Sequence, residues 1–385
     1  MDAKSGARER VTAATRELLA LSHRIHAHPE LGFEEERAAG WLGTALTDAG
    51  FAVESGIADL PTAFIARAGS GPLHLAICAE YDCLPGIGHA CGHNIIAASA
   101  VGAALGLARV ADDLGLTVTV VGTPAEEGGG GKILLLERGA FAGTHAAMMV
   151  HPAPLDIIEP SILACAQFDV HYAGKEAHAS AFPEFGINAA DALTIAQTGI
   201  GLLRQHIRGT DRVHGIVTKG GDAPNVVPAD TRAKYIVRAR TLGELDDIRG
   251  KVMRCFEAGA HATGAKLTVR EDHPPYAEML HDPELAGYYR RNAEALGRSF
   301  PDMGPALQRA AGSTDMGNVS LAMPSIHPMI GIASLPAVNH QPEFTAHCVT
   351  EAADHAVVDG ALAMAWTAID VATDVELRAR LMRRS

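Results

Sequence analysis

The residues with the clearest chemical signal lie in a glycine-rich segment, AEYDCLPGIGHACGHN, at positions 79–94. His89, Cys91 and His93 alternate there, and in an extended segment residues two apart point to the same side of the chain, roughly 6.6 Å apart. Thiolate and imidazole are both good ligands for zinc and related metals. A turn with a buried cysteine and hydrogen-bonded histidines would explain the same residues, but their combination after an apolar run favours a metal site.

Two adjacent carboxylates form the second signal, in the segment TPAEEGGGGK at positions 123–132. It follows an apolar β-branched run, and ligand sites in open α/β sheets lie at the carboxyl ends of strands. Of Glu126 and Glu127, one can ligate a metal and the other can take a proton from water whose pKa a metal lowers. Considered alone, the segment also fits a solvated acidic turn. A phosphate-binding loop is not indicated, because the G-x-x-x-x-G-K-[ST] pattern is missing.

Two further imidazoles are placed where a ligand could lie. His151 follows the apolar run 146–150, and His340 lies in AVNHQPEF at positions 337–344. Each of them alone is more often a structural residue than a ligand. Together with the residues above they give five candidate ligands, enough for two metals that share a bridging residue: Cys91, His93, Glu127, His151 and His340.

Alternating helical and apolar segments must position these residues. This alternation predicts α/β layers with a largely buried sheet. We expect helices at 8–28, 34–49 and 95–110, and strands at 51–54, 63–66, 73–79 and 117–122.

From about residue 165 the pattern changes to that of a second domain. Its order is β-α-β-β-α-β, which is typical of a ferredoxin-like insert with an open sheet. We therefore predict a catalytic α/β domain at 1–165 and 274–385, interrupted by an inserted α+β domain at 166–273. The expected strands of the insert are 167–172, 212–218, 231–240 and 266–270, and its expected helices are 188–205 and 244–262.

Composition excludes several classes of protein. The 385 residues include 32 Lys and Arg against 45 Asp and Glu, for a net charge of −13. With no basic stripe, this balance argues against nucleic acid or a membrane surface as a partner. Six cysteines without a C-x-x-C pair do not make a disulfide framework. The N-terminal segment lacks the apolar core of a signal peptide. We expect a cytoplasmic protein with a small-molecule substrate.

Several ordered motifs resemble the two-metal amidohydrolase and peptidase family that includes aminoacylases, hippurate hydrolase, plant auxin-conjugate hydrolases and carboxypeptidase G-like enzymes. The resemblance covers nearly the whole chain. EYDCLPGIGHACGHN with Asn94, where many other relatives have Asp, and GSTDMGNVS at 312–320 are similar to the branch of aminobenzoyl-glutamate hydrolase and β-alanyl-lysine type dipeptidases. The other matching motifs are HAHPELGFEEE (26–36), GHACGHN (88–94), PAEEGGGGK (124–132), GKEAHAS (174–180), GGDAPNVVPADT (220–231) and VNHQPEF (338–344).

The resemblance implies a fold and a set of cofactors. The fold would be a zinc-peptidase-like mixed sheet with helices on both faces, and the insert would act as a lid and as the contact of a homodimer. Two divalent metal ions per subunit are implied, zinc or manganese first, with cobalt or nickel as alternatives. Cys91 and His93 would be ligands from the metal loop, with Cys91 as the bridge. Glu127, His151 and His340 would complete the ligand set.

The resemblance also implies catalytic roles. Glu126 would be the general base and later the proton donor to the leaving amine. His178, from the insert, would reach the active site of the partner subunit and stabilise the oxyanion, and Asn225 would bind the polar end of the substrate. The implied reaction is metal-dependent hydrolysis of the amide bond of a small N-acyl amino acid, an aminobenzoyl-glutamate-like conjugate or a dipeptide. The alternative is a catalytically retired relative that binds a metabolite.

Three assignments stay open on the sequence alone. Asp82 either orients a ligand histidine or caps a turn. Arg232, Arg238 and Arg240 are candidates to hold a substrate carboxylate, but the sequence favours a solvated strand residue as the interpretation of each. The segment 313–315 either belongs to the substrate pocket or caps a helix.

Overall fold

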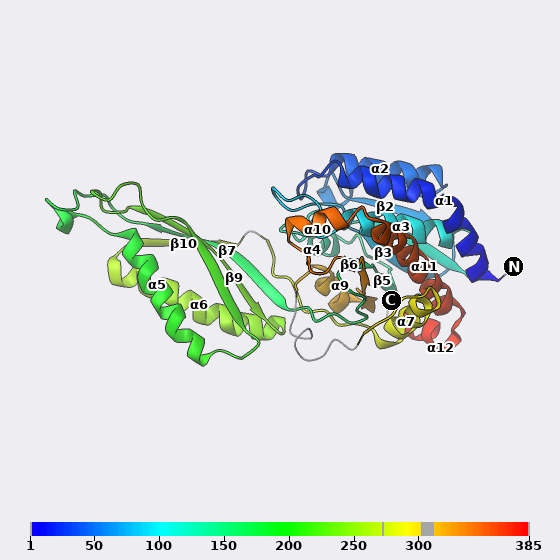
Figure 1. Ribbon diagram of the computed structural model, residues 1–385. Coiled ribbons are helices and arrows are strands. Elements are labelled where there is room, and N and C mark those ends of the chain that lie inside the picture. The colour runs from blue at the N-terminus through cyan, green and yellow to red at the C-terminus, as the bar shows by residue number, and fades with distance from the viewer. Residues whose placement is uncertain (1, 272, 302–311, 384–385) are drawn as a thin grey trace. The chain divides into compact units, whose positions relative to one another are not determined.

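The computed structural model describes residues 2–271, 273–301 and 312–383. The chain divides into two compact units (Figure 1). Unit 1 comprises Met1–Ser161 and Met279–Ser385, and unit 2 comprises Ile162–Glu278. Unit 2 is therefore an insertion in the chain of unit 1.

Unit 1 is built on a mixed six-stranded sheet, whose strands in spatial order are β1 (Ala52–Ser55), β2 (Phe64–Ala68), β4 (Leu116–Gly122), β3 (Leu73–Ala79), β5 (Ala146–Met148) and β11 (Ser325–Ile326). The pairs β1/β2 and β2/β4 are antiparallel, and the pairs β4/β3, β3/β5 and β5/β11 are parallel. Every residue of β4 is buried. Since its side chains alternate between the two faces, both faces of the sheet are covered there.

A second parallel pair and a set of helices complete unit 1. The pair is β6 (His151–Ala153) with β12 (Met329–Gly331), and a short 3₁₀ turn covers Ile57–Asp59. The helices are α1 (Ala3–His26), α2 (Glu36–Asp48), α3 (His93–Ala108), α4 (Gly131–Glu137), α7 (Pro283–Ala295), α9 (Met316–Ala322), α10 (Pro342–His347), α11 (Glu351–Thr373) and α12 (Val375–Met382).

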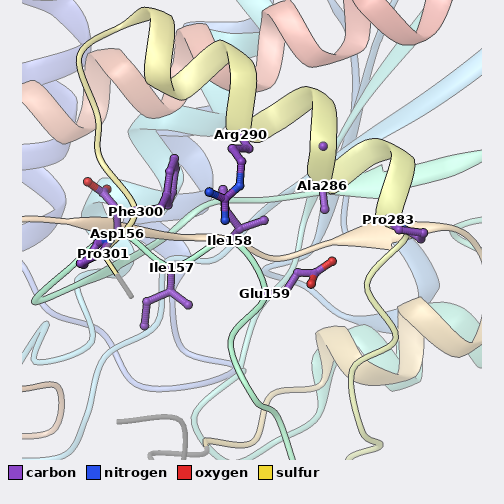
Figure 2. Close-up of a pocket in the computed structure, with 10 residues that line it drawn as sticks. Asp156, Ile157, Ile158, Glu159, Pro283, Ala286, Arg290, Phe300 and Pro301 are labelled. Carbon is purple, nitrogen blue, oxygen red and sulfur yellow. The ribbon is translucent and has the colours of Figure 1, made fainter. Parts of the chain in front are cut away.

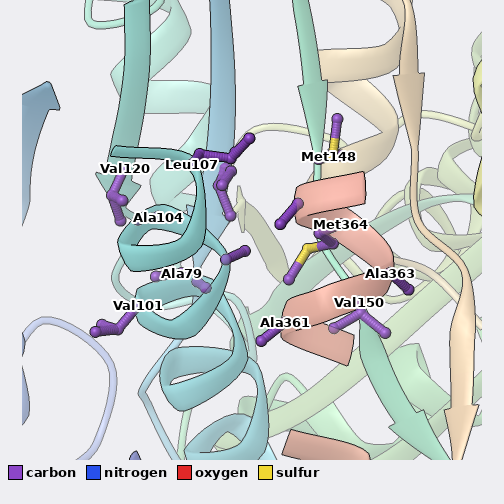
Figure 3. Packing of buried hydrophobic residues seen from close by; sticks show 14 of the residues in the cluster. Ala79, Val101, Ala104, Leu107, Val120, Met148, Val150, Ala361, Ala363 and Met364 are labelled. Atoms are coloured by element: carbon purple, nitrogen blue, oxygen red, sulfur yellow. The ribbon is translucent and has the colours of Figure 1, made fainter. Parts of the chain in front are cut away.

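Small residues allow α3 to lie in the centre of the unit 1 core, against α1 and α11. A Cβ on Gly102 would lie 2.7 Å from the Cβ of Ala361, so only glycine permits this approach of the two helices. Figure 3 shows Leu107 of α3 in the same cluster as Ala361 and Met364 of α11. The alanine-rich run of the sequence is therefore a core helix.

Unit 2 is a four-stranded antiparallel sheet in the order β10 (Lys266–Glu271), β7 (Ala164–Ala173), β9 (Asp230–Ala239) and β8 (Arg212–Lys219). Two helices, α5 (Ala189–Leu203) and α6 (Leu242–Thr263), pack against each other and against this sheet. The chain order β7-α5-β8-β9-α6-β10 is the one that the sequence predicts. Phe168, Tyr235 and Phe256 form an aromatic core, with the Tyr235 and Phe256 ring centroids 5.0 Å apart. Short 3₁₀ turns cover Pro183–Phe185 and Arg204–His206.

One local expectation is wrong: the segment around Cys91 is not extended. Gly92 has φ +75°, and a Cβ there would lie 2.5 Å from the Pro152 side chain, so the chain makes a tight left-handed turn that requires glycine. His93 is then the first residue of α3. The alternation of His89, Cys91 and His93 suggested extended geometry because spacing alone does not distinguish an extended segment from a turn that enters a helix.

The cysteines and the apolar helix α11 are the remaining features of the fold. All six cysteines are free, as the sequence predicts. Within the described ranges, α11 is long and apolar enough to span a bilayer, but 78% of its apolar window is buried inside the protein. This burial is typical of a core helix.

Candidate active site

All five predicted ligand residues lie in unit 1, and their donor atoms form two overlapping groups. Within each group, one donor atom per residue lies within 4.8 Å of the others. One group is Cys91, His93 and His151, and the other is Cys91, Glu127 and His340. Cys91 belongs to both groups, which is what a bridging ligand between two metals requires.

Loops at the carboxyl ends of neighbouring strands deliver these residues. Cys91 and His93 follow β3, and Glu127 follows its parallel neighbour β4. His151 begins β6, shortly after β5 ends. His340 precedes α10, and its backbone N–H donates to a carbonyl oxygen of the Cys91 loop at 3.0 Å. Segments distant in sequence therefore meet at one edge of the sheet.

Asp82 contacts two of the ligand residues through its two carboxylate oxygens. Oδ1 lies 3.0 Å from His93 Nδ1, and Oδ2 accepts the backbone N–H of Glu127 at 2.9 Å. Burial opposes the ionisation of Asp82, but the charge and hydrogen bond of His93 outweigh it and lower the pKa of Asp82. The bond to Nδ1 leaves Nε2 of His93 available as a ligand atom. These contacts are what the orienting role of Asp82 requires.

The other two imidazoles are held differently. His151 Nδ1 lies 2.8 Å from the Pro152 carbonyl oxygen. Because a carbonyl oxygen only accepts, Nδ1 carries the ring proton, and Nε2 keeps its lone pair for a metal. Burial lowers the pKa of His151 to about 4, so the ring is neutral at pH 7. The side chain of His340 is 62% exposed, and its Nε2 lies 3.7 Å from Glu127 Oε2.

Two buried atoms without a hydrogen-bond partner in the described part of the chain show that these residues suit a cation. His93 Nε2 and Glu127 Oε1 are buried and have no hydrogen-bond partner among the described residues. Burial raises the pKa of the Cys91 thiol well above its ordinary value, and the carboxylates of Glu127 and Glu126 raise it further. Such a cluster is costly without a positive charge. Its sulfur, nitrogen and oxygen donors fit zinc and admit manganese, cobalt or nickel.

Glu126 lies beside the ligand groups, with its Oε2 atom 3.9 Å from His93 Nε2. Burial raises its pKa well above the ordinary value, and the carboxylates of Glu80 and Glu127 add to this effect. A carboxyl group with a raised pKa exchanges protons closer to neutral pH. Its position and its chemistry therefore suit a general base.

A buried ion triad next to this cluster escaped the sequence analysis. Lys132 Nζ lies 2.7 Å from Asp315 Oδ1 and also contacts a carboxylate oxygen of Glu80, and all three side chains are fully buried. The other Glu80 oxygen is 3.5 Å from His93 Nε2, and Glu80, His93 and Glu126 form a third donor group. Glu80 directly follows β3, so the strand-end rule could have identified it. No local signal predicts that Lys132 pairs with a residue 183 positions away.

Both predicted residues of the insert lie on adjoining segments of unit 2. His178 pairs with Val226 in an isolated β-bridge, and the Ala179 N–H donates to the Asn225 carbonyl oxygen at 3.0 Å. The His178 and Asn225 residues are exposed. Nδ1 of His178 accepts the backbone N–H of Ala181 at 3.2 Å. In the neutral ring the proton is therefore on Nε2, which can donate to an oxyanion.

The arginines that the sequence left open are mostly engaged at the surface. Arg232 and Arg240 are exposed and pair with Asp230 and Glu244, so the solvated-strand interpretation fits both. Arg238 lies on β9 with Arg232 and is half-buried.

The segment 313–315 serves two purposes. Thr314 Oγ1 accepts the Met316 N–H at 3.2 Å at the start of α9. Asp315 makes no side-chain cap and instead binds Lys132. The capping interpretation therefore holds for Thr314 and is wrong for Asp315.

Two features of unit 1 lie outside the ligand groups. His89, although part of the metal-loop pattern, joins none of the three donor groups, and its ring stacks on His26 with centroids 6.1 Å apart. A cavity of about 580 Å³ is lined by Glu159, Arg290 and Phe300, among others (Figure 2). None of the predicted ligands lines this cavity. The cavity is therefore separate from the donor groups.

Comparison with known proteins places the chain in a family. Residues 76–362 match the model of peptidase family M20/M25/M40. The Xaa-Arg dipeptidase of Mus musculus is 39% identical over 96% of this chain and 88% of that protein. One of the subunits of p-aminobenzoyl-glutamate hydrolase from Escherichia coli is 34% identical over 66% of this chain and 57% of that protein. A dinuclear metal-binding peptidase of Bacillus subtilis has the same fold, with a TM-score of 0.69 at 22% identity over 93% of this chain and 99% of that chain.

The family match covers well over half of the chain, and both curated relatives are named for hydrolysis. The alternative of a retired metabolite-binding relative is therefore not favoured. The chain belongs to peptidase family M20/M25/M40 and is a metal-dependent hydrolase of amide bonds.

Proposed function

We propose that this protein is a dipeptidase that uses two divalent metal ions and prefers a cationic C-terminal residue in its substrate. The observation that carries the two-metal proposal is the pair of donor groups that share Cys91. The substrate proposal rests on the similarity to Xaa-Arg dipeptidase, which spans nearly the whole chain. The net charge of −13 supports it, because an acidic protein attracts cationic substrates.

Five residues of unit 1 would hold the metals. Zinc or manganese would be bound by the donor groups that share Cys91, with cobalt or nickel as alternatives. When bound, such ions polarise the scissile carbonyl and lower the pKa of water. The buried contact of Asp82 with His93 fixes the ring orientation before any metal binds.

The proton transfers would be carried out by Glu126. Its carboxylate takes a proton from the attacking water and returns it to the leaving amine, so one group acts as base and then as acid. Nε2 of His178 would donate a hydrogen bond to the developing oxyanion. Asn225, on the segment next to His178, would bind the polar end of the substrate.

Unit 2 would also form a homodimer. Its edge strand β8 leaves Ile216 64% exposed and Val217 47% exposed, and Leu202 on α5 is 71% exposed. An open sheet edge with exposed apolar side chains pairs readily with another strand. A second copy of β8 would cover the open edge and the exposed side chains on it. The partners we propose are a small-molecule substrate and a second copy of the chain, and we do not propose nucleic acid or a membrane as a partner. The proposed location of the protein is the cytoplasm.

One experiment tests the class and the substrate together. Metal content per subunit is measured, and hydrolysis is followed before and after chelation with Ala-Arg, Ala-Lys, β-alanyl-lysine, Ala-Met, p-aminobenzoyl-glutamate and an N-acetyl amino acid. We expect about two metals and kcat/KM at least about tenfold higher for Ala-Arg than for uncharged Ala-Met. A best rate with p-aminobenzoyl-glutamate would move the substrate to the other branch. Failure of metal to restore any activity would overturn the proposal.

A further inference from the structure

Ala125, directly before Glu126, has an unusual backbone conformation. Its φ is +56°, in the left-handed region that residues with a Cβ rarely adopt, and it is buried. Such strain persists only where the surroundings enforce it, and it tends to occur at functional sites. One contact that enforces it here comes from a segment 90 positions earlier in the chain.

Glu35, just before α2, makes the central contact. Its Oε1 atom accepts the backbone N–H of Ala125 at 2.8 Å, and the residue is fully buried. Its Oε2 atom has no hydrogen-bond partner among the described residues. Burying a carboxyl group is costly, and the bond to Ala125 is the specific contact that this group makes with the Glu126 loop.

Packing closes the same turn around the methyl group of Ala125. A Cβ on Gly32 would lie 2.8 Å from the Ala125 Cβ, and one on Gly129 would lie 2.6 Å from it. The Ala125 carbonyl oxygen accepts the N–H groups of Gly129 and Gly130, both at 3.0 Å. The methyl group is thus enclosed by two glycines, and the turn is fixed on both sides.

Two buried carboxylates therefore accept backbone hydrogen bonds on either side of Glu126. Glu35 binds the N–H of the residue before it, and Asp82 binds the N–H of the residue after it. The N–H that Glu35 binds lies one peptide before the Ala125–Glu126 bond, whose carbonyl oxygen is held by the N–H groups of the two loop glycines. Asp82 holds the peptide that follows Glu126. Together these contacts fix the direction in which Glu126 leaves the backbone. Asp82 also holds the ligand His93, whereas the hydrogen bond of Glu35 is to Ala125, so its effect on the site is exerted through that residue.

We propose that Glu35 is a positioning residue for Glu126, which acts by holding Ala125 in its left-handed turn. The inference rests on the proposed role of Glu126 as the base. It requires an acceptor oxygen at position 35 and a residue at 125 that stays left-handed. Charge at position 35 is not required, so glutamine serves where alanine does not.

Three variants test this in the metal-loaded dimer. E35A removes the acceptor, and we expect kcat to fall about 10–100-fold, since small misplacement of a catalytic group costs up to about that much. KM, metal content and the midpoint of thermal unfolding should change far less. E35Q keeps the acceptor and should remain within about threefold of wild type. Adding A125G to E35A should recover much of the lost kcat, because glycine adopts a left-handed turn without strain.

A matched control and a second readout make the test specific. Ala58 also has a positive φ, +55°, so E35A/A58G should stay as slow as E35A. Hydrogen exchange of peptides covering 123–131 should quicken in E35A and not in E35Q. Wild-type kcat in E35A, or equal loss in E35Q and E35A, or rescue by A58G as well as by A125G, would overturn the proposal. E126Q, assayed in parallel, separates the proposed role of Glu126 from that of Glu35. An active E126Q would overturn the role of Glu126 as the base. An inactive E126Q together with an E35A of wild-type activity would overturn only the role of Glu35.

Discussion

Lys132 in unit 1 and Lys219 in unit 2 each contact two carboxylates, in very different surroundings. Lys132 lies between Glu80 and Asp315, and none of the three side chains is exposed to solvent. Lys219 lies 2.9 Å from Asp230 and 3.0 Å from Asp222 and has a side chain that is 35% exposed. The same arrangement of one lysine and two carboxylates is therefore expected to contribute differently to stability in the two places. Buried charges must stay paired, while exposed charges can exchange their partners for water.

The functional groups of the two units follow the same division. In unit 1 the candidate ligands Cys91, His93 and His151 lie with Glu126 and Asp82 in a buried cluster before any ligand binds, while His340 at its edge is 62% exposed. In unit 2 His178 and Asn225 are exposed on adjoining segments. The functional groups of unit 1 are preorganised by their contacts with one another. The functional groups of unit 2 are exposed, so their positions during the reaction depend on the molecule that binds them. The following changes test this contrast, from the largest expected effect to the smallest.

Glu126→Gln should have the largest effect on activity. Glutamine fits the same space but cannot accept the proton, so kcat should fall about 10²–10⁴-fold. Metal content and the unfolding midpoint should stay near wild type, because the amide removes one of several carboxylates that repel one another there. Steady-state kinetics with metal analysis check this. A variant with near-wild-type kcat would show that the preorganised cluster of unit 1 does not supply the base.

Lys132→Met should have the largest effect on stability. It removes the cation between two buried carboxylates, and breaking a buried ion pair in this way costs about 3–5 kcal/mol. Urea unfolding of the apo-protein measures the cost. Asp315→Asn in the same background should recover part of it, since one unpaired charge is then gone. Equal stability of Lys132→Met and wild type would contradict the view that burial makes this triad indispensable.

His178→Ala should slow turnover without disturbing the fold. Loss of an oxyanion donor lowers kcat about 10²–10³-fold, and because the residue is exposed, the unfolding midpoint should not move. If the histidine acts in the partner's active site, mixing this variant with Glu126→Gln should restore activity in the heterodimers. Verified mixed dimers without any recovery would show instead that His178 acts within its own subunit.

Sequence reasoning succeeded where one rule links local pattern to position. Apolar runs located β3 at its observed bounds and β4 to within one residue, and the strand-end rule placed Glu127 at the edge of the sheet where Cys91 and His93 also lie. It failed where the partner is distant. Lys132 and Asp315 are 183 positions apart, and no spacing encodes their bond.

The left-handed turn at Ala125 was also beyond sequence reasoning. Alanine carries no signal for that conformation, which is imposed by Glu35 and Gly32 from an earlier segment and by Gly129 of the same loop. The contacts that orient the site residues are thus tertiary contacts between distant segments, whereas the ligand residues themselves stand in short local motifs.

Lys219→Met, the exposed counterpart of Lys132→Met, should have the smallest effect. At pH 7 the unfolding midpoint should stay within experimental error of wild type, because water and Arg232 remain as partners for Asp230. Hydrogen bonds from Arg232 and Lys219 lower the pKa of Asp230 to about 2. Any stability from this contact is therefore present above the ordinary pKa of aspartate and is lost as the pH falls through about 2. Any small residual difference between the unfolding curves of the two proteins should therefore lie above about pH 4 and vanish toward about pH 2. A loss at pH 7 as large as that of Lys132→Met would show that burial is not what separates the two lysines.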